Sequence, residues 1–117
     1  MYFDVAVALP PRAIIVRVFP TLHLSPSNAA AIDVALHAVL EDWDEGRSFS
    51  AGGGGAPAES GDVTWIHSSY PDRFWTLQGG HFVSAASATA TIEGTDFYTW
   101  QSTPQLVADV TRWLHAP

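Results

Sequence analysis

The chain has 117 residues, 47% of them hydrophobic and 15% charged, a composition typical of one packed globular domain. Twelve acidic and five basic residues give a formal net charge of -7, which argues against nucleic acid and anionic membranes as partners, because both bind cationic surfaces. The lack of cysteine excludes disulfides, thiolate metal sites and cysteine nucleophiles.

The first residues, MYFDVAVALPPR, do not read as a targeting segment. They lack the basic region of a signal peptide and carry Asp4 where such a peptide would be apolar. No run approaches the roughly 18 apolar residues of a membrane span. The chain is therefore expected to carry neither a signal peptide nor a transmembrane helix.

Two β-strands are expected in the first part of the chain. Residues 14–24 place apolar side chains at nearly every even position, a period-2 pattern that predicts a long strand with its even face inward. Pro20 has no amide donor, so this strand is expected at a sheet edge or at a bulge. Residues 25–28, SPSN, have the composition of a turn. A second alternation over residues 32–40 predicts another strand, with His37 on its polar face.

The middle of the chain is expected to contain more loop than strand. Four acidic residues fall within positions 41–45, and the glycine-rich stretch 51–61 predicts a flexible loop. Residues 63–68 predict a short strand, and residues 83–92 a strand of small side chains. Between these two strands, residues 70–78 form an irregular aromatic segment.

Only the C-terminal end predicts a helix. Thr103 is a good N-cap, and Pro104 suits the first helical position. Apolar side chains then recur at helical spacing, at Leu106, Val107, Val110, Trp113 and Leu114. The whole pattern predicts one mostly β domain over residues 1–117, with a single C-terminal helix.

Four segments of the chain carry a resemblance to a known family. They read YFDVAVALPPRAIIVRVFPTLHLS, IDVALHAVLEDWDEG, GDVTWIHSSYPDRFWTLQGGHF and FYTWQSTPQLVADVTRWL. In this order, and with similar loop lengths, they resemble the DNRLRE-type domain of secreted bacterial proteins, from Tyr2 to Pro117.

The resemblance implies an antiparallel, jelly-roll-like β-sandwich of the carbohydrate-binding-module type, in an extracellular or cell-surface protein. The chain departs from the family in three ways, one of which is Pro20 where family members tend to have an aliphatic residue. His81 stands where family members commonly have an acid after the Gly-Gly pair, and the family's additional strands at both ends are missing. The chain therefore resembles the central portion of the domain, so open sheet edges and a homodimer are expected.

Loop aromatics are the expected ligand-binding surface. Sugar rings stack their apolar faces on aromatic side chains, so a polysaccharide or another neutral ligand suits this chain. The alternative is that these aromatics form a hydrophobic plug at one end of the sandwich. The residues expected to bind the ligand are Tyr70, Asp72, Arg73, Phe74, Trp75 and Gln78. The core or its edge is expected to hold Trp65, Trp100 and Trp113.

Two sets of side chains are candidates for metal binding. One is a carboxylate cluster that offers the hard oxygen ligands calcium takes, although the EF-hand pattern is absent and a solvated turn is the alternative. This cluster comprises Asp42, Asp44 and Glu45. The other is a set of imidazoles that suits a transition metal such as zinc, although no H-E-x-x-H or H-x-H spacing joins them. These histidines are His37, His67 and His81.

Three functions follow from these features. The favoured one is a non-catalytic polysaccharide-binding module of a bacterial extracellular or surface protein. A small metal-dependent hydrolase built from the histidines and the acidic cluster is the first alternative. A structural fragment that assembles through open sheet edges is the second. No catalytic residue is assigned, because no G-x-S-x-G nucleophile motif occurs.

Overall fold

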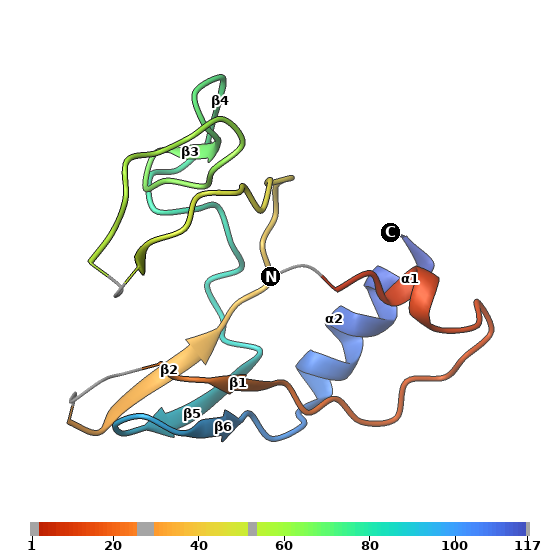
Figure 1. The fold of residues 1–117 in the computed structure, drawn as a ribbon. Coiled ribbons are helices and arrows are strands. Elements are labelled where there is room, and N and C mark those ends of the chain that lie inside the picture. The colour runs from red at the N-terminus through yellow and green to blue at the C-terminus, as the bar shows by residue number, and fades with distance from the viewer. Residues whose placement is uncertain (1–2, 26–29, 52–53, 117) are drawn as a thin grey trace. The chain divides into compact units, whose positions relative to one another are not determined.

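The computed structural model describes residues 3–25, 30–51 and 54–116, which form two compact units (Figure 1). Unit 1 consists of residues 39–83. Unit 2 consists of residues 3–38 and 84–116, so unit 1 is inserted within it along the chain. The single sandwich domain over residues 1–117 stays a prediction.

The strands of unit 2 form two antiparallel ribbons (Figure 1). β1, Thr21–His23, pairs with β6, Phe97–Thr99. β2, Ile32–Leu36, pairs with β5, Ala88–Ile92. Antiparallel strand pairing is thus confirmed, although β6 was not expected from the sequence.

The long strand expected over residues 14–24 is only partly present. β1 spans three of its residues, and Ile14 and Val16 are exposed. The inward even face is therefore wrong for these two side chains, because the described part of unit 2 places no partner strand over them. The turn expected at residues 25–28 lies almost wholly outside the described residues.

The core of unit 2 centres on Trp100. This side chain is 4% exposed and packs with Ala88 and Leu106. Its indole N–H donates to the carbonyl of Val34 at 2.9 Å. The expectation that Trp100 is a core residue is confirmed.

Two helices complete unit 2. α2, Pro104–His115, has Thr103 as its N-cap, and the hydroxyl of Thr103 accepts the N–H of Leu106 at 3.1 Å. α1, Val5–Ala8, was not expected. Its N-cap is Asp4, and it lies against α2. The N-cap and first helical residue predicted for α2 are confirmed.

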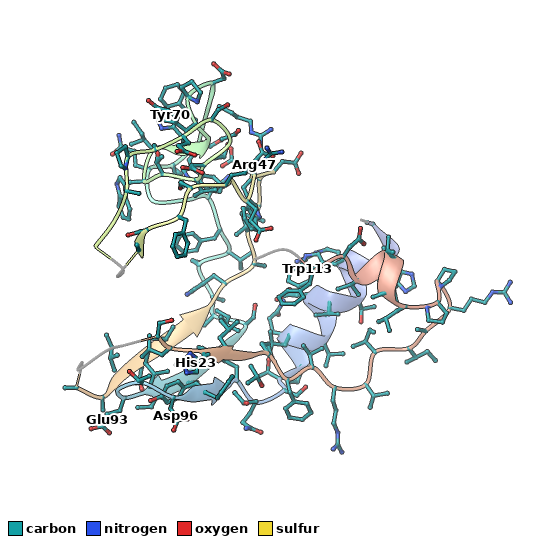
Figure 2. The ribbon with its side chains drawn as sticks, viewed as in Figure 1. His23, Arg47, Tyr70, Glu93, Asp96 and Trp113 are labelled. Atoms are coloured by element: carbon teal, nitrogen blue, oxygen red, sulfur yellow. The ribbon has the colours of Figure 1, made fainter. Side chains whose placement is uncertain are left out.

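Trp113, on α2, does not occupy the expected buried position (Figure 2). Its side chain is 44% exposed, whereas Leu114 is buried. Adjacent helical residues point about 100° apart. Because Leu114 fills the buried position at this level of the helix, the neighbouring indole is left at the surface.

A buried carboxylate fastens α2 to the segment before β5. Asp109 is 1% exposed, and its Oδ2 accepts the hydroxyl of Ser87 at 2.5 Å. Its Oδ1 accepts Gln105 Nε2 at 2.9 Å and Arg112 Nη2 at 3.2 Å. All the donors around this carboxylate come from unit 2, so Asp109 is a structural acid of that unit.

Unit 1 contains little regular structure. β3, His67–Ser69, pairs antiparallel with β4, Arg73–Phe74, and the remaining described residues are turns and loops. Its two ends lie together, since Val39 and Phe82 form an antiparallel bridge. Residues 52–53, inside the expected flexible loop 51–61, lie outside the described residues.

Candidate functional site

Asp62 is the polar centre of unit 1. Its buried carboxylate accepts the backbone N–H groups of Arg47 at 3.2 Å, Ser48 at 3.3 Å and Glu59 at 2.8 Å. Gly46, with φ at 75°, lies so close that a Cβ there would stand 2.1 Å from Asp62 Oδ1. Asp62 thus ties together the chain on both sides of the glycine-rich stretch.

These hydrogen bonds predict that Asp62 stabilises the protein in a pH-dependent way. The side chain of Ser48, followed by the backbone N–H of Glu59, lowers the pKa of Asp62. A lowered pKa stabilises the folded chain above the unfolded-state pKa of about 4, and this contribution is lost as the pH falls through the folded-state value. We expect Asp62→Asn to lower the melting temperature at neutral pH, by an amount that shrinks below about pH 4. Thermal melts of both proteins across this range measure the effect.

Asp42→Asn is the matched control for this prediction. Asp42 is exposed and makes no hydrogen bond with the residues that the structure describes. Its variant should melt close to the wild type at neutral pH. A gap between the wild type and Asp62→Asn that stays constant into acid would contradict the role given to Asp62.

A tight turn over residues 64–67 directs Trp65 outwards. Thr64 Oγ1 accepts the N–H groups of Ile66 at 3.2 Å and His67 at 2.9 Å, and it lies 2.8 Å from His67 Nδ1. Trp65 and Ile66, at the tip of the turn, are both exposed, and Trp65 is 72% exposed. The expectation that Trp65 lies in or beside the core is wrong, because the chain turns here instead of continuing as a strand.

The indole of Trp65 rests on Gly79. The carbonyl of Trp65 accepts the N–H of Gly79 at 2.7 Å, and a Cβ at Gly79 would stand 2.8 Å from the ring atom Cη2. Gly79 also has φ at 85°, a conformation that favours glycine. The ring is therefore held against the backbone while most of its surface faces solvent.

Aromatic rings also surround His67, at the end of the same turn. His67 is buried, with Tyr70 edge-on at 5.0 Å and Phe74 tilted at 4.5 Å between ring centroids. Tyr70 is half-buried, and Phe74 is 60% exposed. Trp75 is half-buried, and its indole N–H donates to the carbonyl of Thr64 at 3.1 Å. Phe74 is thus open to a ligand, whereas Trp75 supports the turn.

The polar residues expected at the site have different surroundings. Arg73 Nε donates to the hydroxyl of the buried Ser68 at 3.0 Å, and Arg73 Nη2 lies 3.6 Å from Asp44 Oδ2. Arg73 therefore links β4 to β3. Asp72 and Gln78 are exposed and make no hydrogen bond with other described residues. Their polar groups are available to a ligand.

Glu41 holds the chain that follows β4. Its carboxylate accepts the hydroxyl of Thr76 at 2.6 Å and the N–H of Thr76 at 3.1 Å. Its Oε2 also lies 3.2 Å from Nδ1 of His81. The hydroxyl of Thr76 is the largest cause that lowers the pKa of Glu41. This contact fixes the segment between β4 and Gly79, on which the indole of Trp65 rests.

The expected metal ligands do not form a cluster in the described part of the chain. Asp44, His67 and His81 each contact another side chain of unit 1, and His37 belongs to unit 2. No three His, Asp or Glu side chains among the described residues are grouped so as to hold a metal ion. The calcium and zinc sites remain predictions.

Trp65 is an exposed aromatic residue of unit 1 that the sequence did not assign to the site. The signal that would have found it is the Gly79-Gly80 pair, because a positive φ and a missing side chain leave room for a ring. Pairing this glycine with Trp65 requires a contact between residues far apart in the sequence. The period-2 pattern of residues 63–68 favoured a strand instead.

No helix in the described ranges has the length and apolar character needed to cross a membrane. The resemblance to the DNRLRE-type domain remains a prediction, and the function is inferred from the side chains of unit 1. No family model, curated protein or solved structure matches the chain.

Proposed function

We propose that the protein is a non-catalytic carbohydrate-binding module in which Trp65 stacks against a sugar ring. The observation that supports this proposal is the exposed indole held on Gly79. A sugar ring has an apolar C–H face, and stacking that face on an indole removes apolar area from water. Because backbone contacts already fix the position of Trp65, binding costs less conformational entropy than it would with a free side chain.

The groups near the turn favour a neutral polysaccharide as the ligand. Phe74 offers a second exposed ring, and Asp72 and Gln78 offer polar groups for sugar hydroxyls. The net charge of -7 disfavours an anionic polymer by repulsion. The ligand-binding set therefore centres on Trp65 and Phe74 instead of Trp75.

The wider assignment is a jelly-roll-like β-sandwich module of a bacterial extracellular or surface protein. Two antiparallel ribbons and a core around Trp100 support the sandwich architecture for unit 2. The proposed ligand supports the location, since structural polysaccharides are found outside the cell. The hydrolase alternative gains no support from the described residues, because its side chains form no metal-binding group.

Trp65→Ala tests this function. We expect the variant to lose about 1 to 3 kcal/mol of binding free energy, the scale of removing one aromatic contact from an interface. Its melting temperature should stay close to that of the wild type, because the indole is mostly exposed. Affinity electrophoresis in gels containing a soluble β-glucan, a xylan or a mannan measures the binding.

Phe49→Ala is the matched control, because Phe49 is an exposed aromatic residue of unit 1 outside the turn. It should bind as the wild type does. The proposal fails if the wild type is retarded by none of the polysaccharides, or if Trp65→Ala is retarded as strongly as the wild type. Trp75→Ala should instead lower the melting temperature, since it removes the hydrogen bond to Thr64.

A further inference from the structure

The outer edge of β1 carries unpaired backbone groups. Over residues 18–24 the even-numbered residues face β6, since the carbonyl of Pro20 accepts the N–H of Trp100 at 2.9 Å and the N–H of Leu24 donates to the carbonyl of Asp96 at 2.8 Å. Successive residues of a strand point their backbone groups in opposite directions. The open side therefore carries groups that pair with no other described backbone. They belong to Phe19, Thr21 and His23.

Pro20 does not protect this edge. A proline on an edge blocks pairing only when its missing N–H lies on the open side. Pro20 is an even-numbered residue, and its carbonyl bonds to Trp100 on the β6 side. The missing donor is therefore on the inner side, and the outer ladder positions remain complete.

We propose that a second copy of the chain pairs antiparallel with this edge, about a two-fold axis through Thr21. In this register Thr21 faces the partner's Thr21, and Phe19 faces the partner's His23. Three residues in each copy, with one N–H and one C=O each, form six backbone hydrogen bonds between the copies. Such an isologous contact closes after two copies. It involves unit 2 alone and does not depend on the proposed carbohydrate site.

The exposed face of β1 is complementary to itself in this register. The ring of His23 already packs on Phe97, with centroids 4.6 Å apart, and Phe19 and Phe97 are both exposed. Placing Phe19 opposite the partner's His23 extends this pair into a row of three rings. Aromatic cross-strand pairs of this kind stabilise antiparallel sheets.

The opposite face of the strand is complementary to itself as well. The same two-fold axis places Val18 opposite the partner's Leu24 and Pro20 opposite the partner's Leu22. Leu22 is among the exposed large apolar residues of the chain. The two faces of residues 18–24 therefore meet like with like, with no polar residue opposite an apolar one on this side.

The distribution of charge around β1 limits the electrostatic repulsion between two copies. Residues 5–32 contain two arginines and no acid, although the whole chain has a net charge of -7. The register places Arg17 opposite the partner's Ser25, one strand away from the turn that carries Glu93 and Asp96. These acids lie at the same end of unit 2 as His23 (Figure 2). Two strand spacings of about 4.8 Å separate Arg17 from that turn, so the attraction is a longer-range one between opposite charges.

Position 21 gives a direct test, because the axis places each residue 21 opposite its own copy. Sedimentation equilibrium of the full chain should give twice 12.6 kDa for the wild type. Thr21→Lys and Thr21→Glu should each raise the dimer dissociation constant by up to about fivefold, since like charges then face each other. An equimolar mixture of the two variants should restore the dimer mass, because opposite charges then meet.

Thr99→Lys is the matched control. Thr99 shares the face of Thr21 and its hydroxyl lies 2.7 Å from that of Thr21, but it belongs to β6, away from the edge. Its variant should remain dimeric. A wild-type mass of one chain at micromolar concentration overturns the proposal, as does a Thr21→Lys protein that dimerises like the wild type. A mixture of the lysine and glutamate variants that stays monomeric overturns the axis through Thr21.

Discussion

Trp100→Ala is expected to lower the free energy of unfolding by about 3 to 5 kcal/mol, the range for truncating a large buried aromatic residue. The side chain fills the centre of the core of unit 2, between Ala88 and Leu106. Its removal leaves a cavity there and deprives the carbonyl of Val34 of its indole donor. Since a domain of this size is stable by only about 5 to 15 kcal/mol, the loss is a large fraction of the total. Urea unfolding followed by circular dichroism measures it.

Trp113→Ala is the matched control for the core prediction. It removes the same side chain from a position that is 44% exposed, so we expect a loss of about 1 kcal/mol or less. If Trp100→Ala does not fold, Trp100→Phe keeps most of the volume and should lose less stability. Equal losses for Trp100→Ala and Trp113→Ala would contradict the position of the core.

Asp109→Ala is expected to cost about 3 kcal/mol of unfolding free energy, the upper end of the range for leaving a buried polar group without its partner. Three donors lose their acceptor at once: the hydroxyl of Ser87, the amide of Gln105 and the guanidinium of Arg112. Ser87 is itself buried, so water does not readily replace the carboxylate. Thermal melts at neutral pH measure the change.

Asp109→Asn separates charge from shape in the same pocket. The amide keeps the size of the side chain and one acceptor oxygen, so this variant should lose less stability than Asp109→Ala. The buried cluster would be of no energetic importance if Asp109→Ala melted at the wild-type temperature.

Local signals in the sequence predicted part of unit 2 well. The helix α2 was found from Thr103, Pro104 and the apolar spacing that follows, because caps and periodicity are properties of neighbouring residues. β2 and β5 were found from alternation and small side chains for the same reason. The expected strand over residues 14–24 was too long. Alternation of apolar and polar residues distinguishes the two faces of an extended segment, but it does not show whether a partner strand is present.

The candidate site was harder to predict because its contacts join distant residues. Alternation around Trp65 resembled a strand, whereas the hydroxyl of Thr64 closes a turn there. The position of the indole depends on Gly79. The position of the segment between β4 and Gly79 depends in turn on the contact between Glu41 and Thr76. No short-range pattern records such pairings, so the aromatic segment was recognised as a candidate while its exposed tryptophan was not.

The insertion of unit 1 also has a consequence for the order of folding. Leu36 and Ala88 are paired, so residues 37–87 form the loop of a hairpin made by β2 and β5. Closing a loop of that length from an unfolded chain carries an entropy penalty that grows with the logarithm of loop length. The bridge between Val39 and Phe82 shortens the loop that remains to be closed to a few residues. This corresponds to about three successive halvings of loop length, which lower the entropy penalty of closing the remaining loop by about 2 kcal/mol. Once unit 1 has closed, β2 and β5 therefore pair at a lower entropy cost than they would from a fully unfolded chain.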